Sequence, residues 1–172
     1  MNLVFKKCTL ENLDDLIAIS IDTFREAFEA YNNPQDFSEY MNSAFSRDSI
    51  SMQLQNPDSE FYFIYQDSLL IAYIKINFGN AQSETINKDA MELERIYILP
   101  KFIGLGYGKI IINKIKEMAR LKPTSFLWLG VWDQNEAAIR FYQRHGFQKF
   151  DEHSFYLGKD KQTDWLMKFE LH

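Results

Sequence analysis

The chain has 172 residues, enough for one domain with its own core and too few for two ordinary domains. Hydrophobic residues make up 46% and charged residues 25%, which is typical of a folded globular protein and excludes a disordered one. A single cysteine, Cys8, excludes an internal disulfide, and the three histidines lack metal-ligand spacing. We therefore expect one domain over residues 1–172 and no metal.

The distribution of charge is uneven, although the net charge is only −5. Residues 11–60 contain eleven acidic and two basic residues, whereas residues 101–122 contain six basic and one acidic residue. Solvated helix faces are the usual explanation, and the alternative is that one region prefers cations and another prefers phosphates. Because the domain is acidic and its basic residues gather in one short helix, we do not expect nucleic-acid binding. No stretch reads as a signal peptide or a membrane span, so we expect a cytoplasmic protein without a membrane partner.

The first third of the chain is predicted to be mainly helical. Residues 3–9 read as a short strand, and residues 10–20 carry apolar residues at helical spacing after Thr9, a candidate N-cap. The helical pattern continues over residues 21–55. It is interrupted by Asn-Asn-Pro at residues 32–34, which predicts two or three short helices.

Strands dominate the middle of the chain. Residues 60–66 and 69–78 are rich in aromatic and β-branched residues and are separated by two polar residues, which predicts a β-hairpin. A polar loop is expected over residues 79–89. Residues 93–99 read as a fourth strand, closed by Pro100.

The last third alternates helices and strands. A helix is predicted over residues 109–121, followed by an apolar strand over residues 126–132. Asp133 and Glu136 resemble a capping box, which predicts a helix from there to His145. The remaining strands are expected at residues 154–157 and 163–169. The order of elements predicts an α/β domain.

A glycine-rich loop joins the fourth predicted strand to the next helix. Gly104, Gly106 and Gly108 alternate along it, and the absence of Cβ atoms lets backbone N–H groups face a ligand. The positive end of the helix dipole and Lys109 both favour an anion there. A tight strand-to-helix turn without a ligand is the alternative for a loop of this kind.

Two other phosphate-binding loops do not fit this segment. A P-loop requires Ser or Thr after Gly-Lys, but Ile110 follows Lys109. A dinucleotide-binding loop requires an acidic residue about twenty positions further on, and residues 126–128 contain none. A loop that binds the diphosphate of coenzyme A remains.

Two motifs resemble those of the GNAT superfamily of N-acetyltransferases. The family's phosphate loop reads Gln/Arg-x-x-Gly-x-Gly/Ala, and residues 103–108 match it at both glycines, with Ile103 in place of the Gln or Arg. The family's second signature, Asn-x-x-Ala-x-x-Phe/Leu-Tyr-x-x-x-Gly-Phe, is matched throughout by residues 135–147. Two motifs in the right order are more specific than either alone.

The resemblance implies the GNAT fold, in which helices cover both faces of a central mixed, mostly antiparallel sheet of about seven strands, splayed between strands 4 and 5. It also implies acetyl-CoA as the co-substrate and a homodimer. The residues expected to contact the cofactor are Ile96, Tyr97, Ile98, Gly104, Leu105, Gly106, Tyr107, Gly108, Lys109, Asn135 and Tyr142. For Asn135, helix capping is the alternative.

Acetyl transfer to an amine requires a base, because an alkylammonium has a pKa of about 10.4 in model compounds. The resemblance implies that Glu94 is this base. Strand alternation places Glu92 on the same face, so Glu92 is the reserve candidate. The alternative is that both carboxylates pair with Arg95 or with solvent. Tyr142 is the candidate general acid for the CoA thiolate, and packing beside Phe141 is its alternative.

The resemblance is closest to bacterial polyamine acetyltransferases of the PaiA type. It is carried by residues 63–65, 81–84, 94–98, 128–132 and 153–156. It implies spermidine or spermine as the acceptor, with Gln82, Glu84 and Glu92 as substrate-binding residues. Two alternatives remain: an acetyltransferase for another small amine or a peptide N-terminus, and a non-catalytic acyl-CoA-binding regulator.

Overall fold

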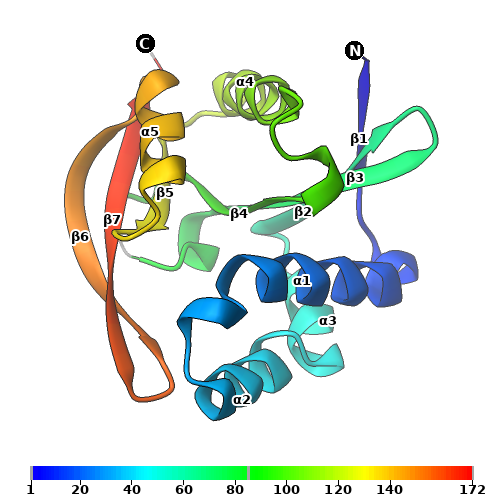
Figure 1. The fold of residues 1–172 in the computed structure, drawn as a ribbon. Coiled ribbons are helices and arrows are strands. Elements are labelled where there is room, and N and C mark those ends of the chain that lie inside the picture. The colour runs from blue at the N-terminus through cyan, green and yellow to red at the C-terminus, as the bar shows by residue number, and fades with distance from the viewer. Residues whose placement is uncertain (1, 85, 172) are drawn as a thin grey trace.

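The computed structural model describes residues 2–84 and 86–171, and its centre is one seven-stranded sheet with helices on both faces (Figure 1). The strand order is β1-β2-β3-β4-β5-β7-β6, and every neighbouring pair is antiparallel except β4 with β5. The main elements are β1 (Leu3–Lys7), α1 (Leu13–Phe28), α2 (Pro34–Ala44), α3 (Arg47–Gln55), β2 (Ser59–Gln66), β3 (Leu69–Phe78), β4 (Met91–Ile98), α4 (Tyr107–Arg120), β5 (Phe126–Trp132), α5 (Glu136–Arg144), β6 (Gln148–Leu157) and β7 (Asp160–Glu170). The predicted mixed, mostly antiparallel sheet is confirmed.

The helices before β2 begin and end where the sequence predicts caps and an interruption. Thr9 caps a 3-10 turn that leads into α1, and its side chain accepts a hydrogen bond from Glu11 N. The continued helical pattern after residue 20 is confirmed: α1 runs on to Phe28, and Thr23 and Phe24 extend its buried face. Asn33 then caps α2 at the predicted interruption.

The C-terminal hairpin is longer than predicted. β6 and β7 pair from Gln148–Lys168 to Leu157–Asp160. Much of this hairpin is polar and exposed, so its hydrophobic pattern marks only the part that packs on the core. The rest is held by main-chain pairing, which a hydrophobic pattern does not record.

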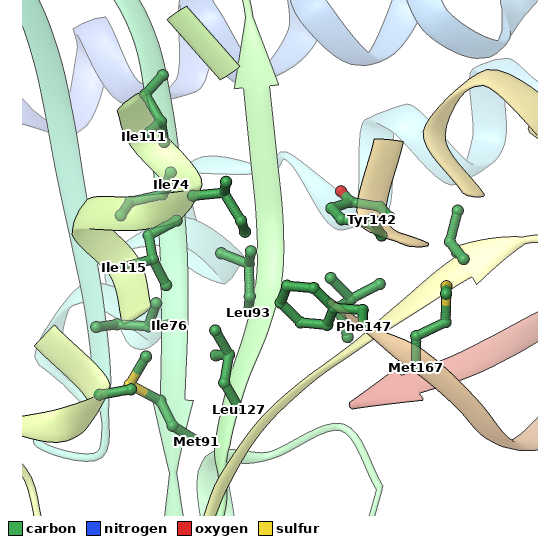
Figure 2. Close-up of a cluster of buried hydrophobic side chains, with 14 of the residues drawn as sticks. Ile74, Ile76, Met91, Leu93, Ile111, Ile115, Leu127, Tyr142, Phe147 and Met167 are labelled. Atoms are coloured by element: carbon green, nitrogen blue, oxygen red, sulfur yellow. The ribbon is translucent and has the colours of Figure 1, made fainter. Parts of the chain in front are cut away.

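Helices lie on both faces of the sheet (Figure 1), and a hydrophobic cluster packs on each face. On one face Ile111 and Ile115 of α4 pack with Leu93, Leu127 and Phe147, all at most 2% exposed (Figure 2). On the other face α1, α2 and α3 pack on β2 and β3 through a second cluster. Burying one large aliphatic side chain contributes about 1.5–3 kcal/mol, so these two layers hold the helices firmly against the sheet.

Candidate active site

β4 and β5 separate in the middle of the sheet. They run parallel but pair only at Met91–Leu127 and Glu92–Trp128. Over the rest of β4, no described strand pairs with its β5-facing edge. A cavity of about 960 Å³ lies in this gap and reaches from the loop before α4 to α1 and the β6–β7 hairpin. The predicted splay between strands 4 and 5 is confirmed.

β4 also contains a bulge at Glu94. Lys75 and Ile76 are adjacent on β3, but their partners on β4 are Arg95 and Leu93, so Glu94 is the extra residue. Bulges next to active sites redirect side chains. Here Glu94 contacts Lys75, and both Lys75 and Arg95 lie over the Phe61 ring, so Glu94 and Arg95 share one side of the sheet although adjacent residues of a regular strand face opposite sides.

The glycine loop has the geometry of an anion site. Gly104 (φ +82°) and Gly106 (φ +87°) adopt the left-handed conformation that other residues rarely take. Gly106 is the N-cap of α4 and has no side chain to cap it, so the first N–H groups of the helix can meet a ligand. Lys109 lines the same part of the cavity. The diphosphate of coenzyme A fits this arrangement of donors and charge.

The other residues of the loop act differently. A Cβ at Gly108 would lie 3.3 Å from the Phe141 ring, so this glycine allows α4 and α5 to pack closely. Leu105 is exposed, and Tyr107 is buried beside Phe102 with its hydroxyl bonded to Gln66. Neither side chain lines the cavity, so the predicted contacts of Leu105 and Tyr107 depend on their backbone.

Ile96, Tyr97 and Ile98 all line the cavity beyond the last β4–β5 pair. Ile96 and Ile98 pack toward α4, and Tyr97 stacks on Tyr73 on the opposite face with ring centroids 5.8 Å apart. The backbone edge of these three residues is therefore the part that faces β5. This arrangement suits the predicted backbone contacts with the pantetheine arm.

α5 begins with a cap from Asn135. Its Oδ1 accepts a hydrogen bond from Ala138 N at 3.1 Å. The predicted capping box at Asp133 is wrong. Asp133 N instead donates to Thr163 O at 3.0 Å, directly after the last β5–β7 pair, Trp132–Asp164. Asn135 also lines the cavity, so it caps the helix from a position where a ligand can reach it.

Tyr142 of α5 is 9% exposed and lines the cavity. Figure 2 shows its side chain among the buried residues of the core. Its ring contacts Phe141 and Phe147 edge-on, with centroids 5.4 and 5.7 Å away. Burial raises the pKa of the Tyr142 hydroxyl. Tyr142 is therefore protonated at neutral pH and able to donate a proton into the cavity.

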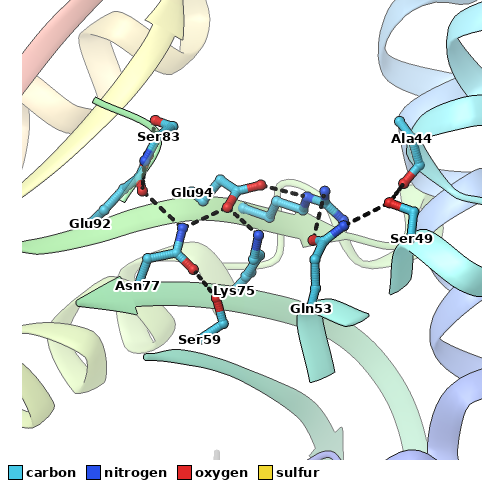
Figure 3. A network of polar contacts seen from close by, with 10 residues as sticks. Ala44, Ser49, Gln53, Ser59, Lys75, Asn77, Ser83, Glu92 and Glu94 are labelled. Atoms are coloured by element: carbon cyan, nitrogen blue, oxygen red, sulfur yellow. Dashed lines mark hydrogen bonds and ion pairs between the residues drawn. The ribbon is translucent and has the colours of Figure 1, made fainter. Parts of the chain in front are cut away.

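Glu94 interacts with two cations. Lys75 of β3, 5% exposed, donates to Glu94 Oε2, and Arg95 Nε lies 3.3 Å from Glu94 Oε1 (Figure 3). Burial opposes ionisation of Glu94, but the charges of Arg95 and Lys75 outweigh it and lower the pKa of this carboxyl. Pairing of Glu94 with Arg95, the alternative considered for it, is present in the structure.

Glu92 has a different environment, although it lines the same cavity and is 2% exposed. Its Oε2 accepts from Ser83 N and from Asn77 Nδ2, both at 2.8 Å, and its Oε1 accepts from Ser83 Oγ. Burial raises the pKa of Glu92, against the opposing effect of these hydrogen bonds. The two carboxylates of β4 thus differ in their readiness to hold a proton.

The far end of the cavity has aromatic walls and a carboxylate. Asp164 of β7 faces His153 of β6, with Asp164 Oδ2 3.5 Å from His153 Nε2. Burial raises the pKa of Asp164, while the charge of His153 opposes the shift. The aromatic residues that line this end are Phe24, Phe28, Tyr40, Trp132 and Phe155.

Gln82 and Glu84 lie outside the cavity wall. The Gln82 amide donates to the carbonyls of Gly79 and Asn87 and accepts from Trp128 Nε1 at 2.6 Å. It therefore braces the loop before β4, and its role as a substrate-binding residue stays a prediction. Glu84 binds His153 Nδ1 at 2.6 Å, so it lies behind a residue that does line the cavity.

Three residues of this site were not found from the sequence: Lys75, Asn77 and Asp164. Lys75 and Asn77 are polar residues inside an otherwise apolar strand, and that contrast was the available signal. Asp164 enters the site through strand pairing near the C-terminus. Local sequence carries no signal for it.

Two further observations bear on the class of protein. The described residues include no group of three or more His, Cys, Asp or Glu side chains placed to hold a metal ion. Among the helices of residues 2–84 and 86–171, none has the length and apolar character needed to cross a membrane.

The parted strands, the anion site at the start of α4 and the buried carboxylates define an acyltransferase that uses a coenzyme A thioester. The chain belongs to the acetyltransferase (GNAT) family, whose model matches residues 15–147. It is an acetyl-CoA-dependent N-acetyltransferase. A relative described as an uncharacterized N-acetyltransferase in the pepI 3' region of Lactobacillus delbrueckii subsp. lactis is 37% identical over 161 residues, covering 94% of this chain and 93% of the relative.

Two solved structures share the fold. The PaiA N-acetyltransferase of Thermoplasma acidophilum, in complex with coenzyme A, has a TM-score of 0.77 and 20% identity, with 99% of each chain covered. A chimera of the spermidine N-acetyltransferase SpeG from Vibrio cholerae has a TM-score of 0.71 and 14% identity, covering 99% of this chain and 96% of the chimera.

Proposed function

We propose that this N-acetyltransferase acetylates a primary amine of a polyamine, such as spermidine or spermine. The observation that carries the proposal is the chemistry of the acceptor end of the cavity. Its described lining includes the carboxylates of Glu26, Glu92, Glu94 and Asp164 and one guanidinium, that of Arg95. Aromatic faces line the same space and attract cations. An elongated molecule with several ammonium groups suits such a cavity.

The cofactor end of the cavity suits coenzyme A. N–H groups at the start of α4 and the Lys109 ammonium would hold the diphosphate, and the open edge of β4 would hold the pantetheine arm. Asn135 is proposed to add a contact to that arm. Acetyl-CoA supplies the activated acetyl group, and an unpaired N–H of β4 would polarise its thioester oxygen.

We assign the role of base to Glu92, the reserve candidate, in preference to Glu94. A general base works best when its pKa lies near the operating pH. The lowered pKa of Glu94 makes this carboxylate a weak base, whereas the raised pKa of Glu92 brings it closer to that range. Glu92 would take a proton from the acceptor ammonium, and the neutral amine would then attack the thioester.

Tyr142 is the proposed acid for the departing thiolate. Its raised pKa keeps the proton in place but makes its release less favourable. The thiolate would form in the same buried space, where the cost of a desolvated charge raises the pKa of the thiol as well. The proton would therefore pass from Tyr142 to sulfur as the negative charge develops.

Direct transfer in a ternary complex agrees with the position of the only cysteine. Cys8 is buried in the cluster beneath α1 and does not line the cavity. Burial raises the pKa of its thiol to about 12. A thiol in this state is a poor nucleophile at neutral pH, so Cys8 does not serve to carry the acetyl group.

The acceptor assignment is tested by measuring thiol release from acetyl-CoA with spermidine, spermine, butylamine and lysine. We expect the polyamines to have the highest kcat/KM. Asp164→Asn should raise the KM for spermidine and leave that for butylamine nearly unchanged, because butylamine has no second ammonium. Calorimetry with coenzyme A serves as the control for folding. Equal kcat/KM values for spermidine and butylamine would contradict the polyamine proposal.

A further inference from the structure

One side chain on β3 joins the two carboxylates of β4 (Figure 3). Asn77 Nδ2 donates to Glu92 Oε2 at 2.8 Å and to Glu94 Oε2 at 2.6 Å. Ser59 fixes the orientation of this amide, because its Oγ donates to Asn77 Oδ1 at 2.7 Å. Asn77 is fully buried, so the two carboxylates are held close together where little water can screen them.

Two carboxylates this close titrate as a pair. Repulsion between like charges disfavours the doubly ionised state and raises the pKa of one member. The other neighbours of Glu92 and Glu94 decide which member keeps its charge and which one binds a proton.

Lys75 and Arg95 distinguish the two carboxylates, because both cations contact Glu94. The Lys75 ammonium donates to Glu94 Oε2 and lies 5.5 Å from the centre of the Phe61 ring, in a position that is 5% exposed. Arg95 adds a second cation at Glu94 Oε1. The hydrogen bonds that Glu92 accepts in the described structure come from neutral groups, the Asn77 amide and the backbone and side chain of Ser83.

We propose that Lys75 and Asn77 are positioning residues that keep Glu94 ionised and thereby reserve Glu92 to accept the proton of the acceptor ammonium. This inference rests on the proposed function of Glu92. The ammonium N–H bond breaks, the nitrogen keeps the electron pair, and the proton bonds to a Glu92 oxygen. Ser83 Oγ suits both states, because a hydroxyl can donate to a carboxylate and accept from a carboxylic acid. Lys75 and Asn77 do not line the cavity, so they act through the carboxylates.

The titratable groups nearest the pair are two tyrosines and two cations. Tyr73 of β3 and Tyr40 of α2 have pKa values raised by burial, so both stay neutral. Arg95 keeps its charge. Burial lowers the pKa of Lys75, against the opposing charge of Glu94.

The test is the pH dependence of kcat/KM with acetyl-CoA and spermidine for the wild type, Lys75→Met and Lys75→Arg. Removing the buried cation raises the pKa values of the carboxylate pair. The acid limb of Lys75→Met should therefore move to higher pH by about one to three units. Lys75→Arg keeps the charge and should return the limb close to its wild-type position. A loss of activity by the same factor at every pH would overturn the inference, since a merely structural role predicts that result.

A second measurement uses the wild-type protein and covers the case in which Lys75→Met does not fold. Carbon-13 NMR of the glutamate carboxyl groups, assigned with Glu92→Gln and Glu94→Gln, should show Glu94 ionising at lower pH than Glu92. The reverse order would overturn the inference. Failure of the proposed base is a separate result: Glu92→Gln with wild-type kcat would remove Glu92 from the reaction, whatever the order of ionisation.

Discussion

Gly158, at the tip of the β6–β7 hairpin, lies directly against Asp36 of α2. A Cβ on Gly158 would collide with Asp36 Cγ, and Gly158 has a φ of +62°. The same contact region includes Leu157, 2% exposed in the cluster beneath the helices, and a 2.9 Å hydrogen bond from Gln162 Nε2 to Asn32 Oδ1. The hairpin is thereby held across the acceptor end of the cavity, whose lining includes Leu157, Gln162 and Asn32.

Gly158→Ala should therefore loosen this end of the cavity. We expect a loss of stability of about 1–3 kcal/mol, from backbone strain and the steric conflict with Asp36. The KM for spermidine should rise, while the affinity for coenzyme A, measured by calorimetry, stays the same. Lys161→Ala, an exposed position on the same hairpin, is the matched control. An unchanged KM in a destabilised Gly158→Ala protein would show that the hairpin does not shape the acceptor site.

Tyr142→Phe should lower kcat by about 10²–10⁴-fold, because it removes the proton donor and leaves the packing of the ring in place. The matched control is Tyr62→Phe, which removes a hydroxyl bonded to Glu60, outside the cavity lining. Steady-state rates of CoA release at saturating acetyl-CoA and spermidine measure both variants. A fully active Tyr142→Phe enzyme would exclude Tyr142 as the acid.

Gly106→Val should weaken coenzyme A binding at least about tenfold, because valine disfavours a φ of +87° and the first N–H groups of α4 would shift. Calorimetric titration with coenzyme A gives the dissociation constant. Leu121→Val, at the exposed far end of α4, is the control and should bind normally. If Gly106→Val binds coenzyme A as tightly as the wild type, the loop is an ordinary bend.

Glu92→Gln should inactivate the enzyme and stabilise the fold at neutral pH. The raised pKa of Glu92 contributes stability below the pKa of an unfolded glutamate, about 4.3, and this contribution is lost as the pH rises through the folded value. Glutamine fits the same donors, since its carbonyl can accept from Asn77 and Ser83 N while its NH₂ donates to Ser83 Oγ. The gain in Tm over the wild type should be small at pH 4 and largest near pH 8. A Tm below the wild-type value at pH 8 would contradict this account.

Much of the fold and of the cofactor end could be predicted, because both are encoded in local patterns. The alternating glycines define the start of α4, and the segment from Asn135 to Phe147 carries a motif within one helix and its ends. The acceptor end depends on contacts between distant strands. Nothing near Arg95 in the sequence indicates the bulge at Glu94, since the bulge exists only in the pairing of β4 with β3. Asp164 likewise reaches the cavity because β7 is inserted between β5 and β6.

The choice of Glu92 over Glu94 as the proton acceptor depends on contacts that the sequence alone does not reveal. Strand alternation places Glu92 and Glu94 on one face but does not distinguish which of them accepts the proton. Their difference comes from Arg95 and Lys75, which both contact Glu94, and Lys75 lies nineteen residues before it on another strand. The environment of each carboxylate separates their roles.

The most direct test of the central claim is a two-substrate initial-rate study with acetyl-CoA and spermidine, with the product identified by mass spectrometry. The account predicts that both substrates occupy the cavity together, so double-reciprocal plots should intersect and the product should be acetylspermidine. Parallel lines, the pattern of an acetylated-enzyme intermediate, would contradict direct transfer between the two ends of the cavity.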